Sequence, residues 1–168
     1  MVEKEKETKI CFGLDNLKHK YEKLRQKFNL PAWKEMNEDF EIEKFQDKET
    51  DLLIRDIRRA MLEKSLSYLK FIEMFLNPAS APMFIFSVVK NVDSDTKKIM
   101  NELYLELGKM EISAIGLDNE YDEKKEAEFI KKLHNKWQDI KFRFKKIVEV
   151  LNSNLEKTGE KNNKGYLG

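Results

Sequence analysis

The chain has 168 residues and a mass of 20.0 kDa, which is enough for one domain with a hydrophobic core. It is 40% hydrophobic and 38% charged, with only six glycines and three prolines, a composition that favours helices. Its 32 basic residues nearly balance 31 acidic ones, which excludes an overall charge bias toward nucleic acid or an anionic membrane.

Cysteine use and hydropathy narrow the class of protein further. The single cysteine, Cys11, excludes an internal disulfide framework and cannot build a zinc site by itself. The charged residues at the start of the chain are not followed by the apolar segment of a signal peptide. The longest run without charge, Met74 to Val89, is shorter than a membrane span of about 20 residues and is interrupted by proline. The sequence therefore predicts a cytoplasmic protein without stable membrane insertion.

The first part of the chain predicts one long helix and one short helix. Residues 1–10 are mostly charged and are expected to be flexible. The next apolar residues are spaced three and four apart up to Pro31, which predicts a helix with a narrow apolar seam: Leu14, Leu17, Tyr21, Leu24 and Phe28. A short helix is expected over residues 32–39, followed by an ordered connector.

The middle of the chain predicts a central helix and a short, very apolar one. A long helix is expected from about Thr50 to Leu76, and its second half is apolar over much of its circumference. The second helix, over residues 80–91, follows a proline in its first turn. Its side chains lie buried across the bundle, which we favour, or form an apolar partner-binding surface with Met83, Phe84 and Phe86. A hairpin that dips into a membrane and a lid over an apolar pocket are further alternatives.

Two further helices complete the prediction. One begins at a cap around Asp93 and runs to about Leu117. The last begins at about residue 122, and its apolar positions fall on one face up to residue 151: Phe129, Ile130, Leu133, Trp137, Ile140, Phe144, Ile147, Val148 and Leu151. The predicted fold is all-α, an antiparallel bundle of four main helices with the 80–91 helix inserted. Residues 11–155 are expected to form a single domain, and residues 156–168 a flexible tail.

No motif predicts catalysis, a metal site or a cofactor. The only histidines, His19 and His134, lack the Glu-x-x-His spacing of a di-metal helical bundle. The glycines are too scattered for a phosphate loop, and no histidine lies at a telling spacing from Cys11. We therefore expect no metal and no cofactor. An enzyme is left open but not favoured, because active sites need no local motif.

Two charged residues lie unusually close to apolar faces. Lys64 projects into the apolar arc of the central helix, and Glu111 lies at the edge of the apolar stripe of the next helix. Because a buried charge needs a partner, the two are candidates for a buried ion pair, or Lys64 for an anion site. The alternative, which we favour, is that Lys64 extends its ammonium group to solvent.

A basic strip lies on the last helix: Lys132, Lys136, Arg143 and Lys146. This strip could follow a phosphate backbone, with Phe142 stacking on a base. Asp139 lies within helical reach of the strip, however, and basic residues toward the end of a helix also suit its dipole. Nucleic-acid contact is therefore an alternative that we do not favour.

The function that we favour is a non-enzymatic protein–protein interaction or scaffold module, with self-association as a homodimer one form of it. The Leu14–Phe28 seam and the apolar 80–91 helix are its candidate surfaces. The alternatives are a nucleic-acid-associated protein using the basic strip, and a small-molecule binder or enzyme. The last would use a pocket near the 80–91 helix, with Lys64 or Glu111 reaching into it.

Overall fold

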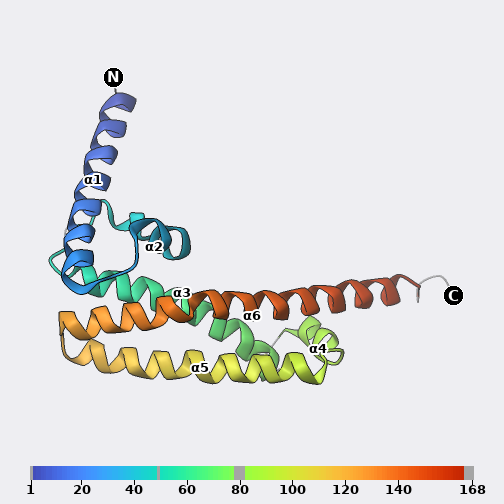
Figure 1. Cartoon of the computed structure of the whole chain (residues 1–168). Coiled ribbons are helices and arrows are strands. Elements are labelled where there is room, and N and C mark those ends of the chain that lie inside the picture. Colours follow the sequence, from blue (N-terminus) through green and yellow to red (C-terminus); the bar gives the residue numbers. More distant parts are fainter. Residues whose placement is uncertain (1, 49, 78–81, 165–168) are drawn as a thin grey trace. The chain divides into compact units, whose positions relative to one another are not determined.

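The computed structural model describes residues 2–48, 50–77 and 82–164, and within them the side chains of all but residues 2–12, 83–84 and 158–164. The chain forms the helices α1 (Val2–Phe28), α2 (Trp33–Phe40), α3 (Leu53–Leu76), α4 (Met83–Val89), α5 (Ser94–Asn119) and α6 (Glu123–Lys164), with a 3-10 helix over Ile42–Phe45 (Figure 1). The described residues contain no strand, which confirms the predicted all-α class. The antiparallel four-helix arrangement stays a prediction.

Several helix boundaries follow from local signals in the sequence. The Asp93 carboxylate accepts a hydrogen bond from the Thr96 amide at 2.8 Å and caps α5. Asp122 likewise accepts hydrogen bonds from the amides of Lys124 and Lys125 at the start of α6. Asn29 ends α1 in the left-handed region, with φ of 54°. Polar side chains at these positions satisfy amides that a helix end would otherwise leave without partners.

Two of the predicted helix ends are wrong. We expected the last helix to end near Leu155, but α6 continues to Lys164. The residues after Leu155 are mostly polar and contain good helix formers, so the loss of an apolar face did not end the helix. Likewise, α1 already begins at Val2, within the segment expected to be flexible. The flexibility of residues 1–10 and 156–168 stays a prediction.

The chain divides into two compact units. The first comprises Met1–Lys64 and Ala114–Asn135, and the second comprises Ser65–Ser113 and Lys136–Gly168. The boundary between the units crosses α3, α5 and α6, so each unit contains part of three long helices. The prediction of a single domain therefore stays a prediction.

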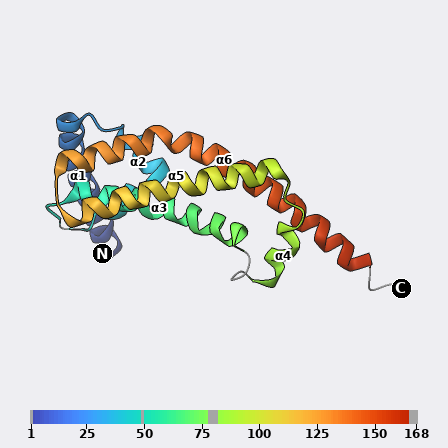
Figure 2. The ribbon, with the colours of Figure 1, turned by 90° about the horizontal axis from the view of Figure 1, so that it is seen from below.

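Each unit has a buried apolar core of its own. In the first unit it includes Tyr21, Leu30, Met36, Phe40, Ile42, Ile54, Ile57, Met61, Ile130 and Leu133. In the second it includes Ile72, Ile85, Val88, Met100, Leu103, Leu107, Trp137, Ile140, Ile147 and Leu151. Within the second unit α5 and α6 run side by side in opposite directions (Figures 1 and 2). Most apolar positions assigned to the face of the last helix are thus buried.

Aromatic rings fill part of the core of the second unit. Tyr68 of α3 stacks on Phe144 of α6 with ring centroids 3.9 Å apart, and on Trp137 at 5.3 Å. Phe71 meets Phe144 edge to face at 5.3 Å and lies 5.0 Å from Phe75. These contacts join the α3 and α6 segments of this unit, and Trp137 is fully buried.

The short helix α4 is buried on one side. Ile85 and Val88 lie in the core of the second unit, whereas Phe86 is exposed. The side chains of Met83 and Phe84, which we predicted to join Phe86 in an apolar surface, lie outside the described ones. Among the described residues, no helix is both long and apolar enough to cross a membrane.

Candidate functional site

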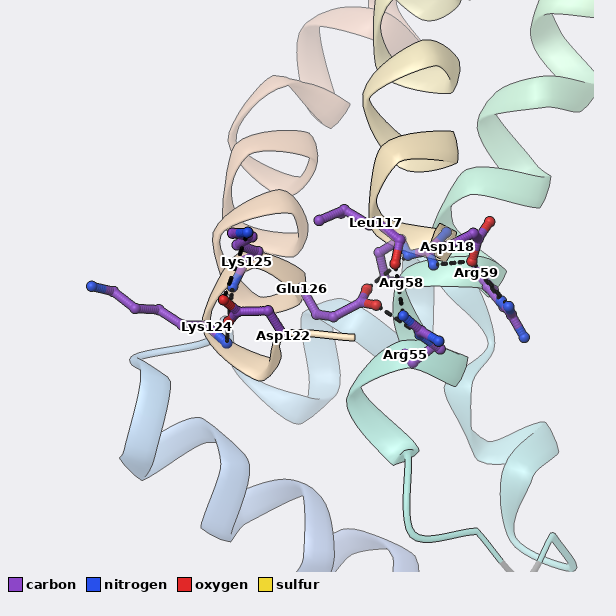
Figure 3. A network of polar contacts seen from close by, with 9 residues as sticks. All are labelled: Arg55, Arg58, Arg59, Leu117, Asp118, Asp122, Lys124, Lys125 and Glu126. Carbon is purple, nitrogen blue, oxygen red and sulfur yellow. Dashed lines mark hydrogen bonds and ion pairs between the residues drawn. The ribbon is translucent and has the colours of Figure 1, made fainter. Parts of the chain in front are cut away.

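A cluster of arginines and carboxylates lies inside the first unit. Arg55, Arg58 and Arg59 come from α3, Asp118 from the last turn of α5, and Glu126 from the first turns of α6 (Figure 3). The spacing of three and four residues along α3 brings the three guanidinium groups to one side of that helix. We call this group the arginine cluster.

Glu126 is the centre of the arginine cluster. Its carboxylate accepts hydrogen bonds from Arg55 Nε at 2.9 Å and from Arg58 Nε at 2.8 Å. The side chains of Glu126 and Arg58 have no solvent exposure. A carboxylate this deeply buried is stable as an anion only if its charge and lone pairs are satisfied, and the two guanidinium groups do this.

The end of α5 supplies the remaining partners. Asp118 accepts hydrogen bonds from Arg58 Nη2 at 2.6 Å and from Arg59 Nη2 at 2.9 Å. Arg55 Nη2 donates to the backbone carbonyl of Leu117 at 2.7 Å. Three positive charges thus face two carboxylates and the negative end of the α5 dipole, which together compensate them.

The pKa values of the cluster follow from these contacts. Burial lowers the pKa of Arg58, but the hydrogen bonds from Arg58 to Asp118 and Glu126 outweigh burial, and its pKa lies above the ordinary value. The hydrogen bond from Arg58 holds the pKa of Asp118 below its ordinary value, with a smaller contribution from Arg59. Arg58 and Asp118 are therefore both charged at neutral pH and form an ion pair.

The arginine cluster holds helix segments of the first unit together. Its central carboxylate is inaccessible, and its contacts join α3 to the end of α5 and the start of α6 within the first unit. One nitrogen, Arg58 Nη1, is buried without a hydrogen-bond partner, a cost that the other contacts must offset. A ligand would have to displace packed side chains to reach Glu126.

The sequence-based predictions missed the centre of this cluster, although a signal was present. Arg58 lies four residues after Ile54 and three before Met61, in a row of buried apolar positions. Glu126 lies four residues before Ile130 on the buried face of α6. Two opposite charges in the middle of two apolar faces are a better indication of a buried ion pair than a charge at the edge of one.

Lys64 and Glu111, the residues that we singled out for such a pair, belong to different units. The Lys64 side chain is 34% exposed, and its ammonium group lies 3.5 Å from the Glu41 carboxylate. Glu111 lies at a partly exposed position of α5. Lys64 therefore reaches solvent past its own methylene groups, and its pairing with Glu111 stays a prediction.

The basic strip is partly compensated by acidic residues. Glu106 of α5 pairs with Lys136 and, at 2.5 Å, with Arg143, which also lies 2.6 Å from Asp139. Lys146 Nζ lies 4.3 Å from the centroid of the Phe142 ring, so a cation lies over one face of the ring expected to stack on a base. Lys132 is exposed. It belongs to the first unit, whereas the other three residues of the strip belong to the second. The nucleic-acid role of the strip stays a prediction.

Glu106 should make the stability of the second unit sensitive to acid. Burial raises the pKa of Glu106, but the hydrogen bonds from Lys136 and Arg143 outweigh burial and leave its pKa below the ordinary value. The unfolded chain then binds more protons in acid, so this stabilisation is present at neutral pH and is lost as the pH falls through the folded-state pKa. We expect Glu106→Gln to flatten the decline in unfolding free energy between about pH 5 and pH 3, measured by urea denaturation.

A matched control is Glu102→Gln, the same change at an exposed position of α5. It should leave the pH dependence unchanged. Equal slopes for the wild type and Glu106→Gln would show that the pKa of Glu106 is not lowered by folding.

The surface of α5 carries exposed apolar side chains. Leu105 is 61% exposed and Ile112 is 72% exposed, although both lie on a helix whose other apolar residues are mostly buried. Ile112 lies seven positions after Leu105, which places the two side chains about two turns apart on one face. In the part of the chain that the structure describes, no group of three or more His, Cys, Asp or Glu residues could hold a metal ion.

The first unit thus contains the buried arginine cluster, and, separately, α5 in the second unit carries an exposed apolar face. Neither arrangement has the geometry of a known catalytic centre. Comparison with protein-family models, with curated proteins and with solved structures found no match to this chain.

Proposed function

We propose that this chain is a cytoplasmic, non-enzymatic helical interaction module that associates with a second copy of itself through α5. The observation that carries the proposal is the exposure of Leu105 and Ile112 on one face of this helix. A single exposed apolar side chain is ordinary on a protein surface. Two that lie on the same helix face and are each more than half exposed favour a partner.

The spacing of the two residues suits a two-fold symmetric partner. In a two-fold symmetric interface both copies use the same patch. Residue i of one copy contacts residue j of the other, and residue j of the first contacts residue i of the second. If two copies of α5 cross antiparallel between Gly108 and Lys109, Leu105 of each copy meets Ile112 of the other. Leu105 and Ile112 would be the anchors of a larger interface, since a stable one buries about 800 Å² on each partner.

The other functions that we considered have less support. The basic strip is partly neutralised by Glu106 and Asp139, so binding a phosphate backbone through it would require Lys136 and Arg143 to leave these partners. A pocket near α4 that contains Lys64 has less support as well, because the Lys64 ammonium group already lies 3.5 Å from the Glu41 carboxylate.

The test is the mass of the full chain in solution as a function of concentration, measured by sedimentation equilibrium. We expect a reversible monomer–dimer equilibrium, and we expect Leu105→Ser/Ile112→Ser to weaken the dimer at least about tenfold. The reason is that each substitution removes an apolar anchor from the interface.

The matched control is Phe142→Ser/Leu155→Ser on α6, which removes two apolar side chains of 57% and 48% exposure from the same unit. It should leave the dimer unchanged. A wild-type chain that stays monomeric at millimolar concentration, or a control that weakens the dimer as much, would contradict the proposal.

A further inference from the structure

The first unit contains a groove that neither the arginine cluster nor the α5 face uses. It lies between the α1 residues Lys20, Lys23, Leu24 and Lys27 and the segment that begins α3, with Glu123 at the start of α6. Its volume is about 300 Å³, which is at the lower end of the range for small-molecule sites. All of its residues belong to the first unit, so it is independent of the α5 face in the second.

The basic side of the groove is formed by α1. Lys20 and Lys23 lie three residues apart, on one face of that helix, and both are exposed. Neither forms an ion pair with another residue in the described part of the chain. Lys27, one turn further, pairs with Glu123 at 2.5 Å. The positive charge that remains available to a ligand is therefore at the Lys20 and Lys23 side of the groove.

The floor of the groove is apolar. Leu24 of α1, which is partly exposed, and the buried Leu53 and Ile54 of α3 line it. Thr50 adds a hydroxyl group whose oxygen already accepts a hydrogen bond from the Leu52 amide at 3.0 Å, which leaves its proton free to donate. A ligand that fits must therefore combine an anionic head with an apolar body.

Charge favours an anion over a cation at this position. Three lysines line the groove against two acidic residues, Asp51 and Glu123, and Glu123 is already paired with Lys27. An anion bound between Lys20 and Lys23 would relieve the repulsion between two ammonium groups on the same helix face.

We propose that this groove binds a small amphiphilic carboxylate, with the head between Lys20 and Lys23 and the apolar body over Leu24, Leu53 and Ile54. Octanoate is a suitable probe, because it has both parts and stays monomeric at the concentrations needed. The binding is measured by titrating the isotope-labelled full chain and following its backbone amide resonances by NMR.

We expect saturable shifts confined to residues of the groove, and binding about tenfold weaker for Lys20→Gln/Lys23→Gln because two charge-assisted contacts are lost. Lys18→Gln/Lys132→Gln is the matched control: it removes two charges from exposed positions of the first unit that do not line the groove. It should bind octanoate as the wild type does.

Two further probes separate the contributions of charge and apolar surface. Acetate has the head without the body, and octylammonium has the body with the opposite charge, so both should bind much more weakly. Binding of either probe as tight as that of octanoate would overturn the proposal. So would the absence of saturable shifts in the groove, or an affinity that is the same in Lys20→Gln/Lys23→Gln.

Discussion

The Glu126→Gln variant is expected to lose about 3–5 kcal/mol of unfolding free energy, which makes it one of the two most damaging substitutions that we predict. Glutamine keeps the shape of the side chain but removes the charge that faces Arg55 and Arg58. Arg58 is fully buried, so it would keep only the partly exposed Asp118 as an ionic partner. Leaving a buried charge without compensation costs more than the ion pair contributes, because the charge cannot return to water. The measurement is urea denaturation of each variant.

Two variants show whether this loss comes from the buried charge. Glu128→Gln makes the same change at an exposed position of α6 and should stay within about 0.5 kcal/mol of the wild type. Arg58→Met/Glu126→Leu removes both fully buried charges and should recover part of the loss, because apolar side chains of similar volume need no ionic partner, whereas Arg55 still lacks its carboxylate. If Glu126→Gln were as stable as Glu128→Gln, Arg58 would not be buried against Glu126 as it is in the structure.

The Trp137→Ala variant is expected to lose about 3–5 kcal/mol, this time through the core of the second unit. Trp137 is fully buried and stacks on Tyr68, which in turn stacks on Phe144. Removing the indole ring leaves a cavity that the neighbouring rings cannot fill without losing their own contacts, so the loss includes a cavity cost as well as lost burial. The decrease in thermal midpoint and in unfolding free energy measures it.

Two substitutions at aromatic positions of α6 provide the comparison. Trp137→Phe leaves a smaller cavity and should show only part of the loss. Phe142→Ala removes a ring of similar chemistry that is mostly exposed, and should cost no more than about 1 kcal/mol. If Trp137→Ala cost as little as Phe142→Ala, the ring at residue 137 would not be part of a packed core.

The two tryptophans also report whether the chain unfolds as the single domain that we predicted. Trp33 packs edge to face on Tyr21 in the first unit, with ring centroids 5.5 Å apart, and Trp137 lies in the second. Replacing one tryptophan at a time leaves the fluorescence of the other as a probe of its own unit. Coincident transitions in the Glu126→Gln background would support one cooperative domain, and separate transitions would contradict that prediction.

Most helices could be predicted because their signals are local. The period of the apolar residues along α6 and the caps at Asp93 and Asp122 depend only on residues within a few turns of each other. The end of α6 could not be read in this way. Apolar periodicity stops near Leu155, but polar residues with good helix propensity continue the helix to Lys164.

The arginine cluster was harder to predict because its members come from three helices. The sequence contains a charge on the buried face of α3 at Arg58 and another on that of α6 at Glu126. Periodicity can indicate that each needs a partner, but it cannot say which acid meets which base. Lys64 attracted attention for the same reason, yet its flexible side chain reaches solvent and Glu41. Whether a charge on an apolar face is buried depends on what packs over it.

By itself, the sequence determined the all-α class, the order of the helices and the positions of most of their ends, because these depend on interactions between near neighbours in the chain. Only the tertiary structure decided that Arg58 and Glu126 are enclosed together, that Glu106 compensates the basic strip, and that Leu105 and Ile112 are exposed. The ion pairs join residues 30 or more positions apart in the sequence. The exposure of Leu105 and Ile112 depends on which parts of α5 other segments cover. They depend on how helices pack, which a pattern along one helix does not specify.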